Sequence, residues 1–252
     1  MATEPMKKIL LLNGSPRREA STTLRAARAV VEGMLRVGGY TCEEVHVRDL
    51  RVHPCTGCLS CWGRTEGECV LRGDDIPALK EKILAADVVF NCYPLYFFSM
   101  PGMMKTVTDR LLSLVKTYHG QDAPPAGGAA HELRYPGTGR KFLLLSTCAF
   151  TQTEVYEPLR RQYDLICGRE NYTAIFCPQF KTMADYGGAR LTRALARLSD
   201  AGEEFLRTGT LCQTTQDELS HPPFSPQVYR TVLARVWDGE RAAGMKDNQK
   251  DK

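Results

Sequence analysis

The sequence lacks the features that assign proteins to several large classes. No stretch reaches the roughly 18 consecutive apolar residues that a membrane-spanning helix requires. The apolar run near the N-terminus, residues 9–12, is also too short for the core of a secretory signal. The 33 basic and 29 acidic residues give a net charge of only +4 and form no long block of one sign. We therefore expect a cytoplasmic protein that binds neither membranes nor nucleic acid.

Several catalytic patterns are missing as well. No Ser-His-Asp set and no pair of carboxylates stands out, so the sequence gives no support for hydrolase chemistry. The turn after the first apolar run matches neither GxGxxG, which binds dinucleotides, nor GxxxxGK[ST], which binds nucleoside triphosphates. The ten cysteines, in a chain expected to be cytoplasmic, favour reduced thiols or metal ligands over a disulfide framework.

What is present is an alternation of short apolar runs and helical periods. With 252 residues and 43% hydrophobic content, the chain can form one α/β domain with insertions. Such an alternation predicts a doubly wound parallel sheet, in which ligands bind at the carboxyl ends of the strands. We expect strands near 7–13, 41–48, 87–96, 141–150 and 171–178, and helices near 21–37, 76–86, 101–117, 154–167 and 185–206.

The rest of the chain forms loops and an extension. We expect residues 1–210 to form the α/β domain, with a cysteine-rich loop at 52–73 and an insertion at 119–139 that is rich in Gly, Pro and Ala. Residues 211–252 are expected to form a polar C-terminal extension whose end is disordered, because this segment has few apolar residues to bury.

The turn between the first strand and the first helix is a candidate phosphate site. Asn13-Gly14-Ser15-Pro16-Arg17 ends the strand, and Ser21-Thr22-Thr23 opens the helix. Hydroxyls, a guanidinium and the free N–H groups of a helix N-terminus together bind anions, and a loop of this length suits a single terminal phosphate. The alternative is that the Ser and Thr residues only cap the helix while Arg17 is a solvated charge.

An aromatic segment follows the third predicted strand. Tyr93, Tyr96, Phe97 and Phe98 lie where a ligand crevice is expected, and aromatic faces with backbone amides can bind a planar ring. The alternative is that some of these aromatics, Tyr93 or Phe98 in particular, fill the core or a subunit interface.

These two segments resemble the flavin loops of a known family. GSPR, followed after three residues by STTL, is similar to the FMN phosphate loop of NADPH-dependent FMN reductases of the flavodoxin-like superfamily, and residues 94–102 with Lys105, Asp109 and Arg110 are similar to its second flavin loop. The resemblance covers about residues 7–180 and implies a five-stranded parallel sheet of order 2-1-3-4-5 with helices on both faces. Ser21 departs from the many relatives that carry Asn, although a hydroxyl can still donate to phosphate. The implied FMN ligands are Ser15, Arg17, Ser21, Thr22, Thr23, Pro94, Leu95, Tyr96, Phe97, Phe98 and Ser99, joined by Thr147 and Cys148 after the fourth strand.

Four cysteines form a separate motif. Cys55, Cys58, Cys61 and Cys69 have the spacing C-x2-C-x2-C-x7-C, and four thiolates so arranged can bind a [4Fe–4S] cluster. The motif resembles that of iron–sulfur flavoproteins, which carry a cluster on the same scaffold. A zinc site and a metal-free thiol loop are the alternatives. The cysteines expected to be structural are Cys42, Cys92, Cys167, Cys177 and Cys212.

The resemblance implies an FMN-dependent oxidoreductase. It would take hydride from NAD(P)H and reduce a quinone, a nitro compound, a flavin or a protein acceptor, and no residue would be catalytic because the flavin N5 carries the chemistry. The alternative is an iron–sulfur flavoprotein that exchanges single electrons with a ferredoxin-like partner. The resemblance also implies a homodimer or homotetramer, while the acceptor and the choice between NADH and NADPH stay open.

Overall fold

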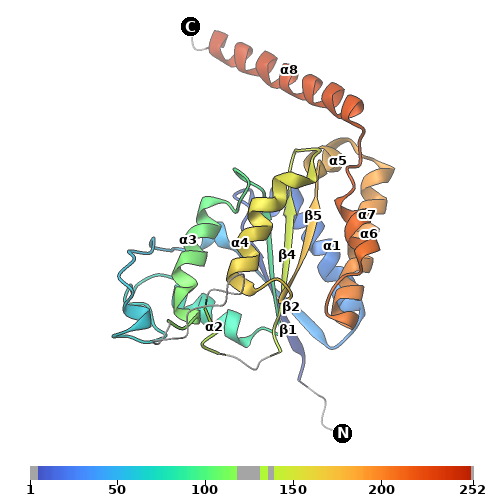
Figure 1. Cartoon of the computed structure of the whole chain (residues 1–252). Coiled ribbons are helices and arrows are strands. Elements are labelled where there is room, and N and C mark those ends of the chain that lie inside the picture. The colour runs from blue at the N-terminus through green and yellow to red at the C-terminus, as the bar shows by residue number, and fades with distance from the viewer. Residues whose placement is uncertain (1–4, 118–130, 136–138, 251–252) are drawn as a thin grey trace.

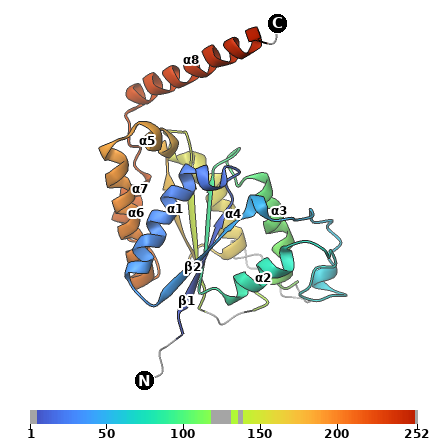
Figure 2. The same cartoon turned by 180° about the vertical axis from the view of Figure 1, so that it is seen from behind.

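The structure, a computed structural model, describes residues 5–117, 131–135 and 139–250, with side chains as far as residue 239. Within these residues, five parallel strands form one sheet in the order β2-β1-β3-β4-β5. Helices cover both faces of the sheet (Figure 1 and Figure 2), so the predicted fold class and strand order are confirmed. The strands are β1 (Lys7–Asn13), β2 (Tyr40–His46), β3 (Val88–Pro94), β4 (Lys141–Thr147) and β5 (Tyr172–Cys177).

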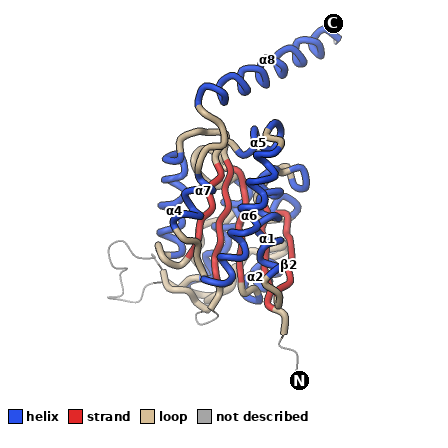
Figure 3. The backbone as a smooth tube through the Cα atoms, turned by 90° about the vertical axis from the view of Figure 1, so that its right-hand side faces the viewer, coloured by secondary structure: helices blue, strands red, loops and turns tan. Residues whose placement is uncertain are grey.

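The sheet lies between two helical layers, as Figure 3 shows from the side. One layer contains α1, α5, α6 and α7, and the other contains α2, α3 and α4. No helix in the described part of the chain is long and apolar enough to cross a membrane. The helices are α1 (Thr22–Arg36), α2 (Ile76–Ala85), α3 (Gly102–Arg110), α4 (Glu157–Cys167), α5 (Phe180–Tyr186), α6 (Ala189–Thr208), α7 (Gln213–Ser220) and α8 (Pro226–Lys250).

The apolar run of β1 is explained by this two-layer arrangement. Ile9 and Leu11 belong to the core layer under α1 and α6, whereas Leu10 and Leu12 belong to the opposite core layer. Each of the four is at most 2% exposed. Since side chains alternate between the two faces of a strand, an unbroken apolar run is expected where both faces are covered.

Helices α1 and α6 approach each other closely because glycines lie at their contact. A Cβ atom on Gly33 would lie 1.6 Å from the carbonyl oxygen of Ser199, and one on Gly202 would lie 1.9 Å from that of Val30. Neither position can hold a larger residue unless the helices move apart. This contact fixes α1, whose N-terminus follows the carboxyl end of β1.

Two predicted helices have different boundaries in the structure. The helix predicted at 185–206 is divided into α5 and α6 at Gly187 and Gly188, and Gly188 has a φ of +49°. A residue in this left-handed region interrupts the helical hydrogen bonds, and glycine adopts it without steric cost. The helix predicted at 101–117 is α-helical only as far as Arg110, and a 3-10 turn follows.

The C-terminal extension contains more regular structure than the sequence predicted. It forms α7 and then α8, which runs to Lys250. Phe224 and Tyr229 are buried in the core layer under α1. The packed body of the fold therefore continues beyond the predicted boundary at residue 210, and Figure 1 shows α8 projecting away from it.

Only a small part of the predicted insertion at 119–139 can be placed. Residues 119–130 and 136–138 lie outside the described residues. The N–H of Arg134 donates to the carbonyl of Leu114 at 2.8 Å, and the Arg134 guanidinium pairs with Glu66 at 2.7 Å. The described part of the insertion thus lies between the end of α3 and the cysteine-rich loop.

Candidate functional site

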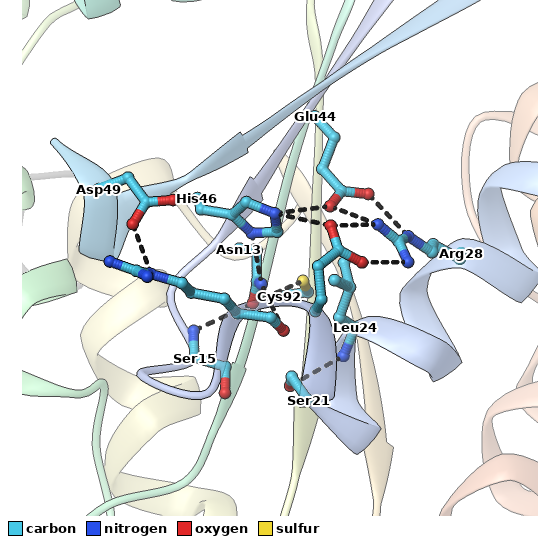
Figure 4. Close-up of polar contacts among 11 residues, drawn as sticks. Asn13, Ser15, Ser21, Leu24, Arg28, Glu44, His46, Asp49 and Cys92 are labelled. Atoms are coloured by element: carbon cyan, nitrogen blue, oxygen red, sulfur yellow. Dashed lines mark hydrogen bonds and ion pairs between the residues drawn. The ribbon is translucent and has the colours of Figure 1, made fainter.

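The N-terminus of α1, with Ser21 and Leu24, lies beside Asn13 and Ser15 at the end of β1 (Figure 4). Ser21 is the N-cap residue, and its Oγ accepts a hydrogen bond from the N–H of Leu24 at 3.1 Å. Among the residues that the structure describes, nothing accepts from the N–H groups of Thr22 and Thr23. The helix dipole adds partial positive charge at this point. The turn therefore has the donors and the charge of an anion site.

Ser15 and Arg17 occupy the preceding turn. The N–H of Ser15 donates to Oδ1 of Asn13 at 3.0 Å, and the Oγ of Ser15 accepts from the N–H of Arg17 at 3.3 Å. Ser15 and Ser21 are 2% and 4% exposed, whereas Arg17 is exposed. Both serine hydroxyls accept backbone hydrogen bonds and keep their own O–H for donation. These residues form the rim of the turn, and Arg17 lies on its solvent side.

The hydroxyl of Thr23 also contacts the end of a strand. Its Oγ1 lies 2.6 Å from the Oγ1 of Thr147, at the end of β4, and both residues are buried. The contact between the two hydroxyls therefore joins α1 to the sheet. Thr147 is likewise engaged through its side chain.

Asn13 and His46 support the turn through hydrogen bonds, a role that was not predicted from the sequence. They are paired in register at the ends of β1 and β2, and Nδ2 of Asn13 lies 3.0 Å from Nδ1 of His46. Nδ2 of Asn13 also donates to the carbonyl of Arg18 at 3.4 Å. A polar residue at the same register position of two neighbouring strands is the signal that would have identified the pair.

An ion-pair network continues outward from His46 (Figure 4). Arg28 of α1 pairs with Glu19 at 2.8 Å and with Glu44 at 2.9 Å, and Nε2 of His46 lies 3.0 Å from Glu19. Hydrogen bonds from Arg28 and then from His46 lower the pKa of Glu19. Glu19, Glu44 and His46 lie close enough to ligate a metal ion, but both carboxylates are already paired with Arg28. The network ties the turn to α1 and β2.

The aromatic loop after β3 contains a strained turn. The N–H of Tyr96 donates to the carbonyl of Ser99 at 2.9 Å, and that of Ser99 donates back at 3.0 Å. Phe97 and Phe98 lie at the centre of the turn with φ values of +45° and +63°. This left-handed conformation favours Gly and Asn, so two phenylalanines here are strained, as is common at ligand sites. The turn leaves Phe97 99% exposed.

The other aromatics divide between the core and the surface. Tyr93 is fully buried and its hydroxyl donates to that of Tyr163 at 3.0 Å, so it is a core residue, the alternative left open for it above. Phe98 stacks on Phe150 with 5.8 Å between ring centroids, and each is 44% exposed. Phe150 follows β4 and was missed from the sequence. The loops after β3 and β4 therefore share an aromatic surface.

The loop after β4 lies against the aromatic loop. The carbonyl of Thr147 accepts from the N–H of Leu95, which follows Pro94, at 2.8 Å. Cys148 is 7% exposed, and burial raises the pKa of its thiol, so it is not a ready nucleophile at neutral pH. The loops after β1, β3 and β4 thus meet where these strands have their carboxyl ends, a place called the sheet edge below. Their free helix N–H groups, exposed aromatic faces and backbone amides fit a planar ring that carries a phosphate.

The four cysteines of the motif line one pocket, which lies at the C-terminal end of α3. Cys55, Cys58, Cys61 and Cys69 surround it, and residues at the end of α3 complete its wall. Burial and the neighbouring thiolates of Cys69, Cys55 and Cys58 raise the pKa of Cys61, whereas hydrogen bonds from Ser60 lower that of Cys58. The thiols that form one motif in the sequence are therefore close enough in the fold to shift the pKa of Cys61.

The spacing of the sulfur atoms bears on the choice of metal. No three of the four sulfur atoms, all of which the structure describes, lie within 4.8 Å of one another. Thiolates on a tetrahedral zinc ion are about 3.8 Å apart, since each Zn–S bond is about 2.3 Å. The separation of the sulfur atoms disfavours zinc, while a metal–sulfur cluster and the metal-free loop stay as the alternatives.

Side chains from neighbouring elements hold the cysteine-rich loop, which has little regular structure beyond the 3-10 turn Ser60–Trp62. Nζ of the buried Lys80 donates to the carbonyl of Gly67 at 2.5 Å and pairs with Glu68 at 2.6 Å. The indole N–H of Trp62 donates to the carbonyl of Leu112 at 3.2 Å. The loop is thus positioned by a few polar contacts.

The charged residues of α3 have structural partners. Lys105 pairs with Asp109 at 2.6 Å, the surface pair expected from their spacing. Arg110 pairs with Asp74 at 2.5 Å, and both side chains are fully buried. Asp74 Oδ1 also accepts from the N–H of Ile76, the first residue of α2, at 3.3 Å.

The remaining cysteines that the sequence assigned to structure are mostly inside the fold. Burial raises the pKa values of Cys167 and Cys177 to about 12 and that of Cys42 to about 11. Cys92 is fully buried in β3, and Cys212 is exposed. The buried thiols are therefore neutral and unreactive at ordinary pH.

Comparison with known proteins identifies the family. Residues 7–188 match a family model described as flavodoxin-like fold. The chain belongs to the flavodoxin-like family. The match covers the five strands and ends before α6, so α6 and the C-terminal extension lie outside it.

Individual relatives come from the branch that the sequence predicted. An iron–sulfur flavoprotein of Archaeoglobus fulgidus is 38% identical over 109 residues, which are 42% of this chain and 46% of that protein. The FMN-dependent NADH:quinone oxidoreductase 2 of Pseudomonas fluorescens is 24% identical over 205 residues, which are 77% of this chain and 98% of that protein. The predicted branch is therefore confirmed. The chain spans about half the length of the iron–sulfur flavoproteins that it matches.

A solved structure supports the fold independently. The NAD(P)H:quinone oxidoreductase from Methanothermobacter marburgensis superposes with a TM-score of 0.60 at 19% identity, covering 79% of this chain and 99% of that chain. A likeness at this identity shows the shared fold and no more.

Proposed function

We propose that the chain is an FMN-dependent oxidoreductase that takes electrons from NAD(P)H and passes them to a quinone, a nitro compound, a free flavin or a protein acceptor. The observation that carries the proposal is the meeting of three loops at one sheet edge, with unpaired N–H groups at the start of α1 and exposed aromatic rings 44% to 99% accessible after β3 and β4. The name of the Pseudomonas relative, an FMN-dependent NADH:quinone oxidoreductase, agrees with this activity.

Each loop has a separate task in this proposal. The hydroxyls of Ser15 and Ser21 and the N–H groups of Thr22 and Thr23 bind the phosphate, and Arg17 approaches from solvent. The backbone of residues 94–99 and the aromatic surface bind the ring, and residues 147–148 close its third side. Bound FMN would supply the redox chemistry, accepting hydride from the nicotinamide. No side chain needs to act as an acid or a base.

The phosphate site can be tested without disturbing the fold. Thr22 is the first residue of α1, where proline is tolerated because its missing N–H has no helical partner. Thr22→Pro should weaken FMN binding about tenfold or more, the loss expected for a hydrogen bond to a charged group. Thr22→Ala, which keeps the N–H, is the matched control. Riboflavin lacks the phosphate, so equal losses for riboflavin and FMN would contradict the assignment.

The enzyme activity requires a separate measurement. NADH or NADPH added without oxygen should bleach the flavin absorbance of purified protein rapidly, and each of the four acceptor classes should then be tried for reoxidation. Slow bleaching by both nicotinamides would contradict the enzyme proposal and favour a protein that only exchanges electrons or only binds flavin.

A second function is favoured by the cysteine pocket. An iron–sulfur flavoprotein, the name that the Archaeoglobus relative carries, would hold a [4Fe–4S] cluster on Cys55, Cys58, Cys61 and Cys69 and exchange single electrons with a ferredoxin-like partner. Protein purified without oxygen should then contain about four irons per chain. Cys58→Ala should lose the iron and keep the FMN, whereas iron-free protein would contradict this alternative.

The subunit arrangement is also a proposal. We propose a homodimer or homotetramer in which residues 1–210 carry the flavin site and the extension contacts a second subunit. Because Phe224 and Tyr229 are buried in the core, deletion of the whole extension would disturb the fold. Deletion after residue 238 is the better test. A light-scattering mass and an FMN affinity that are both unchanged would contradict a role for the end of α8.

A further inference from the structure

Arg110 is the one cationic residue among the described residues that line the cysteine pocket. It lies at the end of α3, and its side chain is fully buried. Asp109 also lines the pocket, but its carboxylate is paired with Lys105 on the helix surface. A buried guanidinium is unfavourable unless its donors are satisfied, so its hydrogen bonds indicate what the pocket is built to hold.

Four of the five N–H donors of the guanidinium are used. Nη1 donates to the carbonyl of His53 at 2.7 Å and to Asp74 at 2.5 Å. Nη2 donates to Asp74 at 3.3 Å and to the carbonyl of Leu71 at 3.5 Å. Nε is buried and has no acceptor among the described residues. A buried donor without an acceptor is rare in proteins and indicates a missing partner.

Cys69 and Arg110 line the same pocket. The guanidinium is also paired with the buried carboxylate of Asp74. Asp74 offsets one positive charge, whereas four cysteine thiolates would bring a larger negative charge into the pocket. The charge and the unused donor are therefore both suited to an anionic group that is held by the cysteines.

We propose that Arg110 is a positioning residue for a metal–sulfur cluster in this pocket: its Nε–H donates to a sulfur of the cluster or of Cys69, and its charge raises the reduction potential of the cluster. The proposal rests on the iron–sulfur form of the function above. A one-electron reduction adds one negative charge and transfers no atom, so a fixed cation nearby favours the reduced form. Hydrogen bonds to cluster sulfurs and local charge are known determinants of such potentials.

The test compares opposite changes of charge at the pocket. Arg110→Gln removes the cation and should lower the midpoint potential in a dithionite titration followed by electron paramagnetic resonance. We expect at least about a tenfold shift of the one-electron equilibrium, which is about 59 mV. Asp74→Asn removes the anion and should raise the potential. Arg64→Gln removes an exposed cation of the same loop and should leave the potential unchanged.

Arg110→Gln leaves Asp74 buried without its partner, and this variant could fail to fold. A second comparison therefore uses a double variant that leaves neither charge buried alone. The double variant Asp74→Asn/Arg110→Gln contains no buried charge at this pair and should have a lower potential than Asp74→Asn alone. Equal potentials in these two proteins would overturn the proposal, because a purely structural role predicts no dependence on the Arg110 charge.

The metal content of the same samples completes the test. Absence of iron and acid-labile sulfide after anaerobic reconstitution of the full chain, or zinc in their place, would also overturn the proposal. FMN content and the rate of flavin bleaching by NADH, measured on those samples, report on the oxidoreductase function separately. A protein that binds FMN and oxidises NADH but holds no iron would therefore reject the role of Arg110 together with the iron–sulfur alternative, and would leave the oxidoreductase function standing.

Discussion

The sheet edge and the cysteine-rich loop are positioned by different kinds of interaction. At the sheet edge, Ser21 is the N-cap of α1 and Thr147 is the last residue of β4, and both are buried. In the cysteine-rich loop, Cys55 and Cys58 are exposed, and the segment is held by contacts such as that from Lys80. The sheet edge therefore depends on packing of the whole domain, and the loop depends on individual side chains.

This difference predicts opposite responses to mutation. A packing change far from the sheet edge should reach it, because α1 carries the phosphate turn and is fixed against α6. A change in one polar side chain should loosen the cysteine-rich loop and leave the sheet edge intact. The predictions below test this contrast at named residues.

The largest effect is expected from Gly202→Ala in α6. The new methyl group would lie 1.9 Å from the carbonyl oxygen of Val30 and force α1 and α6 apart. We expect the free energy of unfolding to fall by about 3 kcal/mol, with weaker FMN binding, as measured by urea denaturation and flavin titration. Gly239→Ala in α8 is the control, since a Cβ there meets nothing within 4 Å and alanine favours a helix. An unchanged unfolding midpoint for Gly202→Ala would contradict the close helix contact.

A smaller and local effect is expected from Lys80→Met in α2. Methionine keeps the apolar stem but loses the hydrogen bonds to Gly67 and Glu68. Local opening of residues 60–70 should become easier by about 2 kcal/mol, the penalty for a lost buried hydrogen bond, as measured by hydrogen exchange. FMN affinity should not change. Lys82→Met, which removes an exposed lysine of the same helix, is the matched control. Loss of FMN affinity in Lys80→Met would show that the two regions are coupled.

Thr147→Val probes a single polar contact within the sheet edge. It leaves the buried hydroxyl of Thr23 without its partner, 2.6 Å away in the wild type. We expect a loss of about 1 kcal/mol in the free energy of unfolding. The double variant Thr23→Val/Thr147→Val should recover part of this loss, because no buried hydroxyl is then unpaired. Additive losses in a double-mutant cycle would contradict the proposed contact.

The fold and much of the sheet edge could be predicted because they depend on local patterns. The apolar run of β1 marks a strand that is covered on both faces, and Ser21 has the chemistry of an N-cap, so the phosphate turn follows from neighbouring residues. The four cysteines could be grouped for the same reason, since their spacing in sequence is short.

Contacts between distant segments could not be predicted in this way. The Asn13–His46 pair depends on the register of β1 with β2, and the Phe98–Phe150 stack depends on how two loops meet. The unused Nε–H of Arg110 is visible only when all of its neighbours are placed. Phe224 and Tyr229 join the core from a segment whose composition indicated a tail.

The smallest effect is expected at the outer end of the turn, from Glu19→Gln. Hydrogen bonds from Arg28 and His46 lower the folded-state pKa of Glu19 below its ordinary value of 4.5. A carboxylate with a lowered pKa contributes stability that is present above its unfolded pKa and is lost as the pH falls through the folded pKa. The urea midpoint of wild type should therefore slightly exceed that of Glu19→Gln near neutral pH, and the two should converge as the pH falls below 4.5. In an Arg28→Gln background the difference should shrink at every pH. A difference that persists in strong acid would mean that Glu19 acts through packing instead of charge.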